Sequence, residues 1–179
     1  MLRLFFSGIS FDSSKVKKND IFFAIKGNKS DGNNFVSIAI KKGSKIIISE
    51  NKITKLKEGI LFFYTKNIRK LLAEVSFKIY SKRPKNLIAV TGTNGKSSIA
   101  DFYYQILKLN NIKVASIGTL GVKSDKININ LPNTTINPIE LGKILNKLKD
   151  QNINNVIMEA SSHGLTRGSD CHSNNNHKR

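Results

Sequence analysis

The segment with the clearest capacity for chemistry is Val90-Thr91-Gly92-Thr93-Asn94-Gly95-Lys96-Ser97. It stands between an apolar run, residues 87–90, and a stretch of helical periodicity, residues 97–109. In such a turn, glycines let the backbone approach an anion, and the N–H groups of the helix N-terminus point toward it. Lys96 adds a point charge for the β- and γ-phosphates of a nucleotide, and the Ser97 hydroxyl can ligate Mg²⁺. The segment therefore predicts a phosphate-binding loop.

Val90 stands where a strict Walker A loop has its first glycine. A glycine turn that only caps a helix is therefore the alternative to a nucleotide site. The strand–loop–helix context and the Gly-Lys-Ser ending favour the nucleotide site. The candidate ATP-binding residues are Gly92, Thr93, Asn94, Gly95, Lys96, Ser97 and Ser98.

A second candidate is the carboxylate of Glu159, which follows the apolar run at residues 156–158. The carboxyl ends of parallel strands are where α/β sheets bind ligands, and carboxylate oxygens suit Mg²⁺. We therefore expect Glu159 to ligate the metal beside Ser97, with Lys96 and Glu159 as the catalytic residues.

Two groups of helices and strands, which follow one another along the chain, are predicted to position these residues. The first group ends at the helix-breaking Pro84, so Arg83-Pro84-Lys85 is the predicted domain boundary and residues 1–83 the first domain. Its predicted strands are residues 20–25, 45–49 and 60–64, and its predicted helices are residues 33–42, with Gly43 as C-cap, and a helix capped by Asn67.

The second group has predicted strands at residues 87–90, 114–117 and 156–158 and predicted helices at 97–109 and 138–149. Apolar strands that alternate with helices predict a parallel α/β sheet. We expect residues 86–167 to form a P-loop domain. Residues 168–179 contain no aliphatic side chain and predict a disordered tail.

The chain has 179 residues and a formal net charge of +18, which raises the question of a nucleic-acid partner. The lysines are scattered rather than gathered with aromatic residues, which favours a solvated basic surface. No apolar run is long enough to span a membrane, and the single cysteine, Cys171, cannot form an internal disulfide. We expect a cytoplasmic monomer that binds neither membrane nor nucleic acid.

The loop Thr91-Gly-Thr-Asn-Gly-Lys-Ser97 resembles the nucleotide loop of the Mur ligase family, whose members join an amino acid or peptide through an acyl phosphate. The string Glu159-Ala160-Ser161-Ser162-His163-Gly164-Leu165 favours the MurE type within the family. MurF and folylpolyglutamate synthetase stay open as alternatives. The resemblance implies a substrate contact for Ser161 and gives His163 no assigned role.

Two further stretches resemble the substrate-binding parts of the MurE type. Phe11-Asp12-Ser13-Ser14 resembles part of the domain of MurE and MurF that holds uridine diphosphate, although Ser14 stands where the family usually has Arg. An ordinary capped turn is the alternative for Asp12-Ser13 taken alone. Asn133-Thr134-Thr135 resembles the element that binds the peptidyl-muramic part, with a simple N-cap as the alternative. The implied contacts to the UDP-sugar are Phe11, Ser13, Asn28, Lys29 and Ser30, and those to the peptidyl-muramic part are Asn133, Thr134 and Thr135.

The resemblance implies a small α/β domain for UDP, ATP and Mg²⁺ as cofactors, and an ATP-binding domain of which residues 86–167 are only the first, incomplete part. An incomplete sheet should leave its last strand at an exposed edge. The implied reaction adds meso-diaminopimelate or L-lysine to UDP-N-acetylmuramoyl-L-alanyl-D-glutamate (UDP-MurNAc-L-Ala-D-Glu), and the residues present do not decide between the two diamino acids. Beyond Leu165 the sequence departs from the family, since Arg167 comes early and nothing later resembles the expected chain. We expect an N-terminal fragment without ligase turnover of its own, and a non-catalytic UDP-sugar or nucleotide binder is the rival interpretation.

Overall fold

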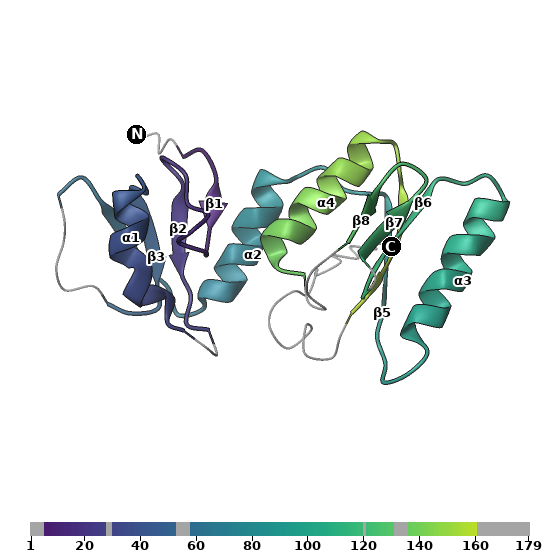
Figure 1. Ribbon diagram of the computed structural model, residues 1–179, viewed down its shortest axis with the longest axis horizontal. Helices are drawn as coiled ribbons and strands as arrows, with labels where there is room; N and C mark the ends of the chain where they lie inside the picture. Colours follow the sequence, from purple (N-terminus) through teal and green to yellow (C-terminus); the bar gives the residue numbers. More distant parts are fainter. Residues whose placement is uncertain (1–5, 28–29, 53–57, 120, 131–135, 161–179) are drawn as a thin grey trace, which may run out of the picture. The chain divides into compact units, whose positions relative to one another are not determined.

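The computed structural model describes residues 6–27, 30–52, 58–119, 121–130 and 136–160 (Figure 1). The chain divides into two compact units, Met1–Ser76 and Phe77–Arg179, and the division falls within helix α2 (Ile68–Ile79). The predicted boundary at residues 83–85 stays a prediction. The predicted tail, residues 168–179, lies outside the described residues.

The first unit contains a sheet of parallel strands in the order β1-β2-β3-β4. The apolar runs predicted β2, β3 and β4, whereas the two-residue β1 carried no strand signal. The predicted helix at 33–42 begins with a 3₁₀ turn, η1, and continues as α1. The elements are β1 (Ile9–Ser10), β2 (Ile21–Ala24), η1 (Gly32–Phe35), α1 (Val36–Lys41), β3 (Ile46–Ser49) and β4 (Leu61–Tyr64).

The core of the first unit lies around β2 and β3, both of which are buried along their whole length. Phe22 and Ile47 pack with Ala39 of α1 on one face of the sheet, which α1 covers in Figure 1. Strand β4 is an edge, and its side chains are largely exposed. The two central strands therefore hold the sheet in place, and their carboxyl ends are fixed points for the turns that follow.

The second unit contains a sheet in the order β5-β9-β6-β7-β8, in which β5, β9 and β6 are parallel and the last two strands antiparallel. The predicted strands and helices are all present. The hairpin β7–β8 was not predicted, because these strands are short and interrupted by polar residues. The elements are β5 (Asn86–Val90), α3 (Lys96–Leu109), β6 (Val114–Gly118), β7 (Gly121–Ser124), β8 (Asn128–Ile129), α4 (Pro138–Asp150) and β9 (Asn155–Glu159).

The expectation that the last strand lies at an exposed edge is wrong. Strand β9 is inserted between β5 and β6 and pairs with both. After β5, the chain crosses over through α3 and returns to the sheet as β6, which leaves room for one strand between β5 and β6. Strand β9 occupies that place. Val156 and Ile157 are consequently buried, and the parallel edge is β5, where Ile88 is exposed.

The two helices of this unit cover the sheet differently. Helix α4 begins at the N-cap Asn137, whose side chain accepts a hydrogen bond from Glu140 N at 3.0 Å, and it buries Leu141, Leu145 and Leu148 in the main core. Figure 1 shows α3 on the opposite side of the sheet from α4. Helix α3 buries Ala100 and Tyr104. Four of its other apolar residues, Ile99, Phe102, Ile106 and Leu109, are more than half exposed.

Candidate active site

The predicted phosphate-binding loop connects the carboxyl end of β5 to the start of α3. Gly95, the N-cap of α3, adopts a left-handed conformation with φ of 77°, which a residue with a side chain adopts at a cost. A glycine cap also leaves the first N–H groups of the helix without a side-chain acceptor from the cap. These groups and the helix dipole favour an anion at this position. Thr91–Gly95 and Ser97 are exposed.

Lys96, the first residue of α3, folds back over the loop. Its ammonium donates to the carbonyl oxygen of Gly92 and, at 3.2 Å, to that of Thr93. Two neutral carbonyl oxygens therefore hold the positive charge of Lys96 beside the loop. A phosphate there would be a stronger, charge-assisted acceptor for the same ammonium.

The structure brings together the two predicted metal ligands, which are far apart in the sequence. Ser97 Oγ donates to Glu159 Oε2 at 2.9 Å. The contact exists because β9 pairs with β5, with Glu159 opposite Val90, and because Ala160 N donates to Val90 O at 2.8 Å. The end of β9 thus lies directly beside the start of the loop. A hydroxyl and a carboxylate at this separation can ligate one Mg²⁺ ion.

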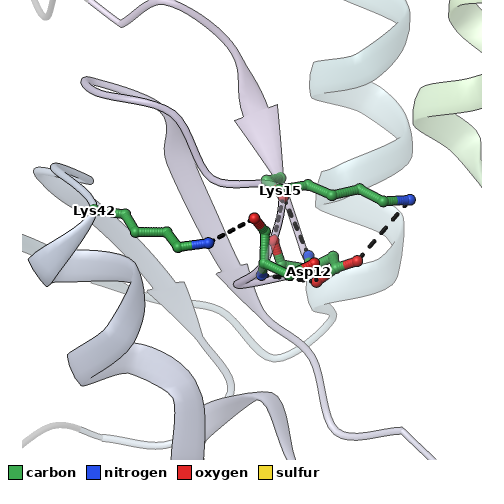
Figure 2. A network of polar contacts seen from close by, with 5 residues as sticks. Asp12, Lys15 and Lys42 are labelled. Carbon is green, nitrogen blue, oxygen red and sulfur yellow. Dashed lines mark hydrogen bonds and ion pairs between the residues drawn. The ribbon is translucent and has the colours of Figure 1, made fainter.

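The predicted UDP site begins with the turn that follows β1, whose polar contacts Figure 2 shows. Asp12 Oδ1 accepts hydrogen bonds from Ser14 N at 2.9 Å and from Ser14 Oγ at 2.7 Å. The hydrogen bond from the Ser14 hydroxyl is the main reason that the pKa of Asp12 is lowered. Lys15 Nζ lies 4.0 Å from Asp12 Oδ2, and Lys42 Nζ donates to Ser14 O at 2.6 Å. The turn is therefore fixed mainly by contacts between near neighbours.

Ser10 anchors this turn from inside the sheet. The buried Ser10 hydroxyl donates to Asp12 O at 2.8 Å and accepts from Asp12 N at 3.2 Å. The side chain of Phe11, the residue between Ser10 and Asp12, is exposed, and Ser13 is half-buried. Ser10 and Lys42 were not among the predicted site residues, because their contribution depends on contacts that the sequence does not reveal.

Ser30 lies in the loop that follows β2, at the same edge of the sheet. Its carbonyl oxygen accepts from Gly27 N at 2.9 Å, and Asp31 caps η1 by accepting from Asn33 N at 2.9 Å. The backbone hydrogen bond from Asn33 lowers the pKa of Asp31. Phe11, Ser13 and Ser30 therefore all follow the carboxyl ends of neighbouring parallel strands, β1 and β2, which is where α/β sheets bind ligands.

Several predicted site residues lie outside the described residues. They are Asn28, Lys29, Asn133, Thr134, Thr135 and Ser161, together with His163. Within the described ranges, no group of three or more His, Cys, Asp or Glu side chains could hold a metal ion, and no helix is long and apolar enough to cross a membrane.

Comparison with known proteins gives a consistent result. The Mur ligase family, catalytic domain, matches residues 6–85, and the Mur ligase middle domain matches residues 90–174. The chain is 42% identical over 162 residues to a UDP-N-acetylmuramoyl-L-alanyl-D-glutamate–2,6-diaminopimelate ligase of Rickettsia montanensis, covering 88% of the chain and 33% of the relative. It is 43% identical over 168 residues to the ligase of the same name from Wigglesworthia glossinidia brevipalpis, covering 89% and 34%.

Solved structures agree with the sequence relatives. A structure of a UDP-N-acetylmuramoyl-L-alanyl-D-glutamate–2,6-diaminopimelate ligase matches with a TM-score of 0.76 at 28% identity, covering 91% of this chain and 33% of that one. A MurF ligase from Thermotoga maritima in complex with ADP shares the fold, with a TM-score of 0.58 at 23% identity, covering 90% and 34%. The chain belongs to the Mur ligase family. It spans about a third of the length of the curated relatives that it matches.

Proposed function

We propose that the chain binds ATP on the Gly92–Ser98 loop and UDP-MurNAc-L-Ala-D-Glu at the carboxyl edge of the first sheet, as part of an ATP-dependent ligase. In that reaction the γ-phosphoryl group of ATP passes to a substrate carboxylate and ADP leaves. The amine of the incoming amino acid then attacks the acyl phosphate and releases phosphate. The names of the relatives favour 2,6-diaminopimelate over L-lysine as that amino acid.

The observation that carries the proposal is the convergence of Lys96, Ser97 and Glu159 at one end of the second sheet. Ser97 Oγ and Glu159 Oε2 are 2.9 Å apart, so the residues present fit a Mg²⁺ ion. When bound, this ion would neutralise the negative charge of the phosphates. The role of Lys96 is to orient the β- and γ-phosphates, and that of the α3 N-terminus is to hold them through backbone N–H groups.

Lys96→Ala tests the nucleotide site. Loss of one charge-assisted phosphate contact should weaken ATP binding by about 1.5–3 kcal/mol, which is roughly 10- to 150-fold in affinity. Lys85→Ala is the matched control, because Lys85 is an exposed lysine next to the opposite end of the same strand, β5. Calorimetry with ATP and Mg²⁺ measures both variants. Equal weakening in both would mean that the nucleotide responds to the net charge of the protein and not to the loop.

The ligase reaction requires a separate measurement. Release of phosphate that depends on UDP-MurNAc-L-Ala-D-Glu and 2,6-diaminopimelate together would support catalysis by the chain. Binding of ATP and of the UDP-sugar without phosphate release would favour the rival function of a non-catalytic binder. Binding of neither ligand would contradict both.

A further inference from the structure

Gly118, the last residue of β6, has the Glu159 carboxylate lying against its backbone. A Cβ atom on Gly118 would overlap Glu159 Oε1 and would lie 2.7 Å from Cδ and 3.2 Å from Cγ of the same side chain. Real Cβ atoms are almost never found closer than 3.0 Å to another atom of this kind. Only a residue without a side chain therefore leaves Glu159 in its observed position.

The requirement for glycine at this position is not conformational. Gly121, across the turn from Gly118, has a φ of 105°, and a Cβ there would overlap the carbonyl oxygen of Ile129. Gly95 also has a positive φ, but a Cβ there would meet nothing within 4 Å. Gly118 is not among the glycines with positive φ. An alanine at position 118 would therefore keep the backbone unstrained and would disturb the Glu159 side chain.

The pairing of the strands explains why the two residues meet. Ile117 of β6 pairs with Met158 of β9, so Gly118 and Glu159 are the next residues along the two parallel strands. Successive side chains of a strand alternate between the two faces of the sheet, so Glu159 shares a face with Ile157 and not with Met158. The contact with Ser97 shows that this is the face covered by α3. The carboxylate thus lies between the Ser97 hydroxyl and the bare backbone of Gly118.

We infer that Gly118 is a positioning residue for the metal site: its missing side chain creates the space in which the Glu159 carboxylate reaches Ser97. The consequence of this inference for catalysis rests on the proposed function, whereas the packing of Glu159 against Gly118 is independent of it. The atoms that a Cβ at position 118 would meet all belong to the flexible side chain of Glu159. The fold can therefore accept Gly118→Ala by moving the carboxylate away from its place beside Ser97.

The first experiment needs no nucleotide. In protein with ¹³C-labelled glutamate, the carboxyl resonance of Glu159 is identified by its loss in Glu159→Gln. We expect Gly118→Ala and Ser97→Ala each to shift this resonance, with little change in melting temperature for Gly118→Ala. Thr119→Ala, a change at the next and exposed residue, should leave it in place. An unshifted Glu159 resonance in Gly118→Ala would overturn the inference.

The second experiment measures the enhancement of ATP affinity by Mg²⁺. We expect Gly118→Ala to reduce this enhancement about 10-fold or more, as for other changes that misorient a metal ligand. Adding Gly118→Ala to Glu159→Gln should have no further effect, because both changes act through one carboxylate. Independent, additive losses would overturn the inference.

The failures of the two proposals are distinguishable. If wild-type protein shows no Mg²⁺-dependent binding of ATP, the proposed nucleotide function fails, and the position of the carboxylate is still decided by the resonance of Glu159. If wild-type protein and Glu159→Gln differ as expected but Gly118→Ala behaves as wild type, the metal site stands and the role of Gly118 is refuted.

Discussion

The carboxyl edges of the two sheets are built from contacts of different range. At the edge of the first sheet, Ser10, Asp12 and Ser14 hold one turn through hydrogen bonds between residues two positions apart. At the edge of the second sheet, Ser97 and Glu159 meet across 62 residues of sequence. The turn at Asp12 is therefore held mainly by local contacts, whereas Ser97 and Glu159 meet only when β9 is inserted between β5 and β6.

This difference predicts how each edge responds to damage. A local turn keeps most of its contacts when the packing beneath it is weakened. A site assembled from separate strands loses its geometry as soon as their pairing is disturbed, because each ligand is carried by a different element. Substitutions in β9 should therefore affect the candidate metal site far more than the turn at Asp12.

The largest effect is expected from Ile157→Ala. Ile157 is 1% exposed and lies at the centre of β9, and loss of a buried isoleucine side chain costs about 2–5 kcal/mol of stability. Urea unfolding measures this loss. Amide hydrogen exchange should show faster exchange in β5, β6 and β9, with protection in β2 and β3 retained. Equal loss of protection in both units would contradict the independence of the two edges.

A smaller effect is expected from Asp12→Asn. Solvent screens the partly exposed Asp12 carboxylate, so its removal should cost less than about 1 kcal/mol. The pKa of Asp12 is lowered in the folded protein. Its contribution is therefore present above the unfolded value, 3.8, and is lost as the pH falls through the lower folded pKa. Urea unfolding should separate wild type from variant at pH 7, and the difference should shrink progressively as the pH falls below 3.8. A difference that does not shrink would show that charge is not the cause.

The smallest effect is expected from Lys15→Ala. Lys15 Nζ is 4.0 Å from Asp12 Oδ2, and the Lys15 side chain is exposed while that of Asp12 is partly exposed, so the ion pair should contribute roughly 0–0.5 kcal/mol. The same unfolding measurement at low and high salt checks this. A loss as large as that in Asp12→Asn would show that the turn depends on its ion pair and not on the Ser14 hydrogen bonds.

Sequence patterns predicted the elements better than their arrangement. The apolar runs at β2, β3 and β9 mark buried parallel strands because both of their faces are covered. The apolar run at β5 also predicted a strand, but that strand lies at an exposed edge of the sheet. The place of β9 in the sheet could not be predicted from chain order, since the crossover through α3 determines it. The hairpin β7–β8 was missed because two- and four-residue strands produce almost no periodicity.

The site residues also differ in whether local sequence or contacts between strands reveal them. Lys96 and Ser97 stand in a local motif, and Glu159 follows an apolar run, so each was predicted from its own surroundings. Gly118 gave no sequence signal, because its importance lies in a contact with a side chain on another strand. Helix α3 illustrates the same limit, since its apolar periodicity predicted the helix but not that Phe102 and Leu109 would be exposed.

The most direct test of the central claim uses Mn²⁺ in place of Mg²⁺, because the two ions accept the same oxygen ligands. A paramagnetic ion broadens the NMR signals of nearby residues. With ATP present, we predict selective broadening of the amide signals of residues 92–98, Gly118 and Glu159, while the turn at residues 11–15 stays sharp. Broadening at the turn instead, or uniform weak broadening over the whole chain, would contradict a nucleotide–metal site at the end of β5 and β9.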